Sequence, residues 1–72
     1  MHRFFFTAEY KGATLRDDDG EFFATEAQAF AHGRLIANEL GRNNPTPVSV
    51  SVLDEAGHVL ATARAGHDAA ID

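Results

Sequence analysis

The chain contains no cysteine, a single lysine and only two prolines among its 72 residues. The absence of cysteine excludes disulfide bonds and zinc sites built on thiolates. A domain of this size buries only about 60% of the surface that its unfolded chain exposes, so its stability is marginal. With disulfides excluded, a metal or oligomerisation remains as the means of supplementing so small a core.

Basic residues are scarce, since six Lys and Arg stand against eleven Asp and Glu for a net charge of −5. This balance argues against general binding to phosphate backbones. A sheet that carries aromatic side chains can stack bases, and Phe5 with Arg3 nearby would be such a group. Those platforms are ringed with Lys and Arg, however, so nucleic acid is not an expected partner.

The chain also lacks a long apolar run and a small-residue cleavage site behind its first apolar residues. We therefore expect neither a signal peptide nor a membrane span, and we expect a cytoplasmic protein. The 44% of hydrophobic residues nonetheless indicates a folded globular domain.

The first predicted element is a strand at residues 3–10, where RFFFTAEY is rich in aromatic residues. Alternation places Phe4 and Phe6 on the core face and Phe5 on the opposite face. Lys11 and Gly12 predict a turn.

A second strand is predicted at 13–16, with Leu15 pointing inward, and a third short extended piece at 21–23. The segment from Thr25 to Gln28 reads as a capping box, in which the Thr25 hydroxyl accepts from the Gln28 amide and the Gln28 side chain reaches back to the Thr25 amide.

The helix that follows is predicted to run to about Leu40, with Gly41 in a left-handed conformation just past its end. Its apolar stripe consists of Ala29, Phe30, Gly33, Ile36, Ala37 and Leu40. Gly33 costs roughly 1 kcal/mol in a helix interior, and we expect it to let the helix lie close to the sheet.

Beyond a polar connection at 42–47, the residues VSVSVLD alternate and predict a strand with its valines on one face. Residues 54–57 predict a turn with Gly57 in a left-handed bulge, followed by a strand at 58–65. In this hairpin Asp54 lies opposite His58 and Val52 lies opposite Leu60, while Leu53 and Val59 point to the far face.

These elements predict an α+β fold in the order β-β-α-β-β, a small antiparallel sheet with one helix packed on one face. The domain is expected to span residues 1–64, followed by a flexible tail at 65–72. The residues expected to be most buried are Phe4, Phe6, Leu15, Phe30, Ile36, Leu40, Val50, Val52 and Leu60.

The Arg3–Phe6 run, the acidic turn from Asp17 to Gly20, the alanine-rich helix and the Asp54–Gly57 hairpin resemble a family of short bacterial proteins of unknown function. Its members occur in soil and plant-associated bacteria, and the resemblance extends to about residue 64. The resemblance implies this fold and a cytoplasmic setting, and it offers no catalytic residues of the family to assign to this chain. A fainter similarity in topology links the chain to the antitoxin half of bacterial toxin–antitoxin pairs.

The acidic stretch LRDDDGEFFATE, residues 15–26, is similar to a calcium loop at its third, fifth and twelfth positions, Asp17, Asp19 and Glu26. Its first position is Leu15, which cannot coordinate a cation. An exposed turn with Gly20 at a positive φ is therefore the preferred interpretation, and weak cation binding is left open.

The four histidines, His2, His32, His58 and His67, lack metal-site spacing and are expected to be exposed, with His58 pairing locally with Asp54. No cysteine nucleophile, G-x-S-x-G elbow or glycine-rich phosphate loop is present. We predict no enzyme, no catalytic residue, no metal and no cofactor.

The predicted function is that of a non-enzymatic interaction module that forms a weak homodimer or binds a protein partner. The candidate interface consists of Phe5, Leu53 and Val59 on the uncovered sheet face, with Leu35 on the helix as an apolar residue outside the stripe. The alternative is an antitoxin-like regulator that neutralises a basic partner protein.

Overall fold

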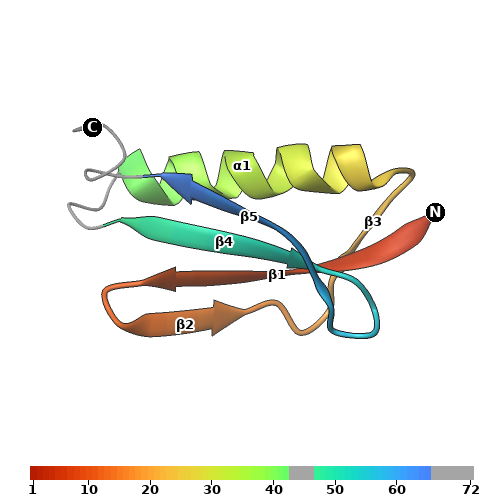
Figure 1. The fold of residues 1–72 in the computed structure, drawn as a ribbon, viewed down its shortest axis with the longest axis horizontal. Helices are drawn as coiled ribbons and strands as arrows, with labels where there is room; N and C mark the ends of the chain where they lie inside the picture. The colour runs from red at the N-terminus through yellow and green to blue at the C-terminus, as the bar shows by residue number, and fades with distance from the viewer. Residues whose placement is uncertain (43–46, 66–72) are drawn as a thin grey trace.

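A computed structural model describes residues 1–42 and 47–65 of the chain. The elements are β1 (His2–Tyr10), β2 (Ala13–Arg16), β3 (Glu21–Phe23), α1 (Glu26–Arg42), β4 (Val48–Leu53) and β5 (Val59–Ala65). The strands form one antiparallel sheet, and α1 packs on one face of it (Figure 1). The α+β prediction is confirmed, and β3 adds a strand to the predicted order.

The sheet has the strand order β2-β1-β4-β5, and β3 pairs with β1 beyond the end of β2. Since β2 and β3 follow the same edge of β1, the acidic turn between them interrupts that edge of the sheet. The β1–β2 hairpin closes through Lys11 and Gly12, whose φ angles of 53° and 74° suit a two-residue turn with both residues left-handed.

In the β4–β5 hairpin Leu53 pairs with Val59, whereas Val52 lies opposite Ala61, so the predicted position of Val52 opposite Leu60 is wrong. A register shift at this point makes Leu60 an extra residue on β5. Without the shift, Arg64 would face the core opposite Val48, where burial of its charge would be costly. The bulge places small alanines there instead.

The start of α1 confirms Thr25 as the N-cap, since the Gln28 amide donates to its hydroxyl oxygen at 3.2 Å. The reciprocal bond differs from the prediction, because Gln28 Oε1 accepts from the amide of Ala24 at 3.1 Å. The predicted helix end is also wrong. The helix continues through Gly41 to Arg42, and Gly41 is absent from the positive-φ glycines of the described residues.

The core lies between α1 and the face of the sheet that it covers, which we call the core face. Its buried hydrophobic residues are Phe4, Phe6, Ala8, Ala29, Ala37, Val48, Val50 and Val52. Of the predicted core, Phe30, Ile36, Leu40 and Leu60 are only partly buried and pack around this centre. Alanines and valines occupy the centre because Gly33 allows the helix to approach β4 closely.

The prediction of a buried Leu15 is wrong. Leu15 pairs with Ala8 and shares the core face, but it is 51% exposed. The reason is the lateral position of α1, which lies along β4 and β5, whereas β2 is at the opposite side of the sheet (Figure 1). The helix therefore leaves Leu15 half uncovered.

The polar connection predicted at 42–47 and the tail predicted at 65–72 fall mostly at positions 43–46 and 66–72, outside the described residues, as does His67.

Candidate functional site

The sheet face opposite α1, which we call the open face, carries an apolar row formed by Phe5, Leu53 and Val59. Phe5 of β1 pairs with Leu53 of β4, and Leu53 pairs with Val59 of β5. The register thus places Phe5, which is distant in sequence, beside the hairpin pair of Leu53 and Val59, so that the three side chains form one row across three strands. Phe5 and Leu53 are partly buried by their surroundings, and Val59 is 59% exposed.

Leu35, the fourth residue of the predicted interface, does not join this row. It lies on α1, which packs on the other face of the sheet, and its side chain is 56% exposed. It stands two residues from Gly33 and two from Ala37, which are buried together with Ala29 on the face of the helix toward the sheet, so it points away from the sheet. The structure therefore separates Leu35 from the other three.

A hydroxyl row lies next to the apolar row. Thr7 pairs with Arg16 on one side and with Ser51 on the other, and Ser51 pairs with Thr62. The hydroxyl oxygens of Ser51 and Thr62 are 3.3 Å apart, a hydrogen-bond distance across the two strands. The open face therefore offers apolar surface and hydrogen-bonding groups side by side.

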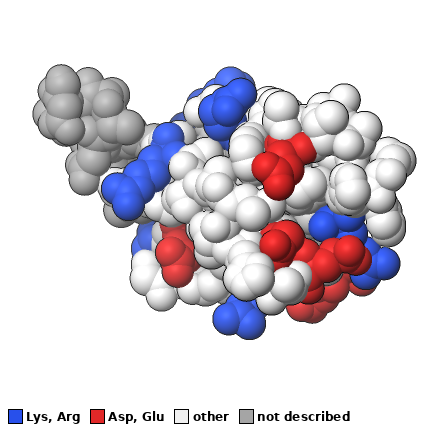
Figure 2. Space-filling model, turned by 45° about the vertical axis from the view of Figure 1, so that its right-hand side comes forward, with Lys and Arg blue, Asp and Glu red and all other residues white. Residues whose placement is uncertain are grey.

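Both rows contribute to a shallow hollow with a volume of about 710 Å³. Its charged lining is mostly negative, with Arg16 the basic member among the described residues. The acidic members are Glu9, Asp17, Asp18, Asp54 and Glu55. Figure 2 shows one side of the molecule, on which acidic and basic side chains are interspersed with uncharged surface and form no continuous basic area.

Arg3 and Phe22 form a contact on the open face that the sequence did not reveal. Phe22 pairs with Arg3 and is 55% exposed, and the guanidinium carbon lies 5.1 Å from the centre of its ring, a cation–π geometry. Arg3 Nε also lies 4.0 Å from a carboxylate oxygen of Glu55. The signal that could have predicted this contact is alternation along β3, which assigns Phe22 and Phe23 to opposite faces of the sheet.

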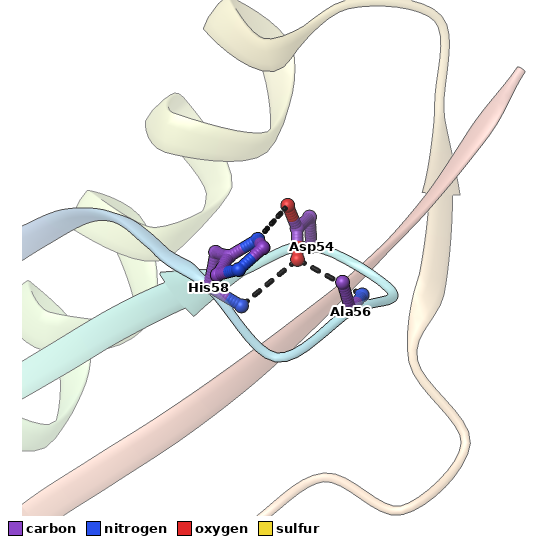
Figure 3. Close-up of polar contacts among 3 residues, drawn as sticks. All are labelled: Asp54, Ala56 and His58. Atoms are coloured by element: carbon purple, nitrogen blue, oxygen red, sulfur yellow. Dashed lines mark hydrogen bonds and ion pairs between the residues drawn. The ribbon is translucent and has the colours of Figure 1, made fainter.

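The β4–β5 loop is held by the carboxylate of Asp54 (Figure 3). Its Oδ1 accepts from the amides of Ala56 and His58, both at 2.9 Å, and its Oδ2 lies 3.3 Å from His58 Nδ1. The bond from the His58 amide is the main cause that lowers the pKa of Asp54 below its ordinary value, and the His58 side chain and the Ala56 amide add to it. Gly57, at a φ of 89°, completes the predicted turn. The predicted local pair of His58 and Asp54 is confirmed.

The acidic turn after β2 is organised by its own backbone. Asp17 Oδ1 accepts from the amides of Asp19 at 3.3 Å and Gly20 at 3.1 Å, and Gly20 has the predicted positive φ of 74°. Glu21 belongs to β3 and Glu26 to α1, so the residues of the calcium-loop pattern lie on different elements. The described residues bring together no group of three or more His, Asp or Glu that could hold a metal ion.

His32 corrects the expectation of an exposed histidine. Its ring lies 5.1 Å from that of Phe6 and 5.3 Å from that of Phe23, and its Nε2 is 3.4 Å from a carboxylate oxygen of Glu21. It therefore forms part of the junction between α1 and β3. His2 and His58 are exposed as expected.

A comparison with protein families finds one model, a domain of unknown function named DUF6894, that matches residues 3–66. The chain belongs to the DUF6894 family. No curated protein and no solved structure matches it. Apart from His2, the first residue of β1, the DUF6894 match covers the strands and the helix described above, including the open face. None of the helices in the described ranges 1–42 and 47–65 is long and apolar enough to cross a membrane.

Proposed function

We propose that this DUF6894 protein is a small, non-enzymatic interaction module of the bacterial cytoplasm, which self-associates weakly through the open face of its sheet. The observation that supports this proposal is the apolar row of Phe5, Leu53 and Val59, which no element of the described chain covers. Soluble monomers seldom leave contiguous apolar patches in water.

The size of the row sets the strength of association. Burial of a side chain such as Phe5, Leu53 or Val59 contributes roughly 1.5–3 kcal/mol when complete, and association itself carries an opposing entropic cost. Phe5 and Leu53 are already partly buried in the monomer, so the gain is smaller. The hydroxyl row beside them dilutes the patch further. A modest, reversible dimer is therefore expected, and not an obligate one.

Charge is compatible with such a dimer if Arg16 of one copy meets the acidic rim of the other. Nucleic acid is not a proposed partner, because the rim is mostly negative and the chain carries one lysine.

Sedimentation velocity at concentrations on the order of tens of micromolar tests the proposal. The native chain should show a monomer–dimer equilibrium, and Phe5→Lys should shift it to monomer. Leu35→Lys is the matched control, because it adds the same charge at an exposed apolar residue on the other side of the molecule. A native chain that remains monomeric would refute self-association. A dimer that resists Phe5→Lys would move the interface to a strand edge, or to Leu35 if the control variant dissociates.

The acidic rim supports a second candidate function, an antitoxin-like regulator that neutralises a basic partner protein. Carboxylates around an apolar centre are suited to a partner that presents Lys or Arg around an apolar anchor. A pull-down from native cells should then recover one basic protein, and Asp17→Asn with Asp18→Asn should weaken its binding more at low salt than at high salt. If the Phe5→Lys variant recovered as much of the basic protein as the native chain does, the open face would be excluded as the binding site for that partner.

A further inference from the structure

We infer that the free edge of β5, together with the flank of α1 beside it, binds an extended acidic polypeptide segment as an additional strand. This site lies at the edge of the sheet, where it shares Thr62 and Arg64 of β5 with the open face, and it does not depend on the function proposed above. Recognition of this type uses the backbone groups of an edge strand for affinity and an adjacent groove for specificity.

The two edges of the sheet differ in their openness. On one edge β2 and β3 are short, at 4 and 3 residues, and the acidic turn interrupts them. Short strands and charged interruptions are devices that prevent edge pairing. On the other edge β5 has 7 residues, VLATARA, which include neither Lys nor Pro. In the described residues nothing pairs with the outer side of β5.

A groove accompanies this open edge. It has a volume of about 200 Å³ and lies between α1 and β5, with Phe30 on the helix and Ala61 and Ala63 on the strand. The small alanines leave this space because the bulge at Leu60 turns them toward the helix. A strand added beside β5 would direct alternate side chains into the groove, which suits residues such as Val or Ile.

The charge of the groove indicates the chemistry of the segment. Its charged lining residues in the described chain are Arg34 on α1 and Arg64 on β5, with Asn38 beside them and no acidic residue. Both arginines are exposed, and neither forms an ion pair with another described residue. In a chain of net charge −5 this is a local basic site, complementary to Asp and Glu.

The same charge disfavours a second copy of the chain at this edge. The helix residues that line the groove, Phe30, Arg34 and Asn38, are centred on Arg34, and the strand residues are centred near Thr62. If two chains paired along β5 about a two-fold axis, Arg34 of one chain would therefore lie close to Arg34 of the other. Such like-charge contact is unfavourable, whereas an acidic segment would neutralise both arginines.

Panning of a phage-displayed random heptapeptide library on the purified full chain tests the inference. Selected peptides should be rich in Asp and Glu, carry β-branched or aliphatic residues at alternate positions, and lack proline. The strongest synthetic peptide should shift backbone amide NMR signals of β5 and of the Phe30–Asn38 flank. Its affinity should fall roughly tenfold or more in the variant Arg34→Glu with Arg64→Glu.

Arg16→Glu is the matched control, since it reverses a charge on the opposite edge strand and should leave the affinity unchanged. Circular dichroism checks that each variant keeps the fold. The inference is overturned if no peptide is enriched, if enriched peptides are basic, or if the shifted signals map to β2 or to Phe5 and Leu53 of the open face. Concentration-dependent shifts of the Phe30–Asn38 flank without peptide, which the open-face dimer would not cause, would assign the edge to a second copy and overturn the acidic partner.

Discussion

Gly33 of α1 and Val52 of β4 approach each other so closely that a Cβ added to Gly33 would lie 2.8 Å from Cγ2 of Val52. Val52 is 1% exposed, so its methyl group cannot move into solvent. The glycine costs helix stability but brings α1 against the sheet. This contact sets the position of the helix over β4.

Gly33→Ala should therefore destabilise the domain. The alanine gains about 1 kcal/mol of helix propensity, but overpacking of a filled core costs typically 1–3 kcal/mol. Urea denaturation should show a lower midpoint for Gly33→Ala than for the native chain. Val52→Ala makes room for the new methyl, so the double variant should be more stable than the sum of the two single effects predicts. Strict additivity would show that the two residues are not in contact.

Thr25→Ala should cost about 1 kcal/mol, because the Gln28 amide loses the hydroxyl oxygen that accepts its hydrogen bond at the first turn of α1. Thr25→Ser retains the acceptor and should be close to the native chain in its urea midpoint. If both variants unfold at the native midpoint, Thr25 does not act as the N-cap.

The lowered pKa of Asp54 predicts a pH dependence of stability. Since the pKa is lower in the folded state, the contribution of the carboxylate is complete above its unfolded value of about 4 and is lost as the pH falls through the folded value. Urea midpoints measured from pH 7 down to about pH 2 should therefore fall less steeply for Asp54→Asn than for the native chain. Identical profiles for the two would contradict the proposed role of this carboxylate in the loop.

Leu15→Thr should change the free energy of unfolding by no more than about 0.5 kcal/mol, because the side chain is half exposed on a short edge strand. Phe6→Ala, on the same face but beneath the helix, should cost about 3–5 kcal/mol. The comparison can be made by chemical denaturation. A large loss with Leu15→Thr would indicate that another part of the chain or a partner covers this residue.

Calcium should not bind the acidic turn with a dissociation constant at or below the micromolar range. The Asp17 carboxylate is engaged by the amides of its own turn, and Leu15 occupies the first ligand position. Isothermal titration calorimetry with calcium chloride checks this expectation, with Asp17→Asn as a control for any weak signal. Binding in the micromolar range would require the turn to rearrange.

Much of the fold could be predicted because its signals are local. Alternation along 3–10 and 48–53 assigned Phe4, Phe6, Val50 and Val52 to the core face, and all four are buried. The cap formed by Thr25 and the turn formed by Gly57 each involve only residues close in sequence, so the sequence pattern alone predicts them. The same alternation placed Phe5, Leu53 and Val59 on one face, and the observed register makes them neighbours.

Other features depend on contacts between elements that are distant in sequence. Leu15 shares a face with the core, and its exposure follows from where Gly33 seats α1 on β4, a relation that no local pattern contains. The bulge at Leu60 keeps Arg64 outside a core that the other strands form. His32 is half buried because Phe23 of β3 folds back beside it. Local propensity leaves the burial of Leu15 and His32 and the register of β5 undetermined, and the packing of α1 on the sheet determines them. The same packing forms the groove beside β5.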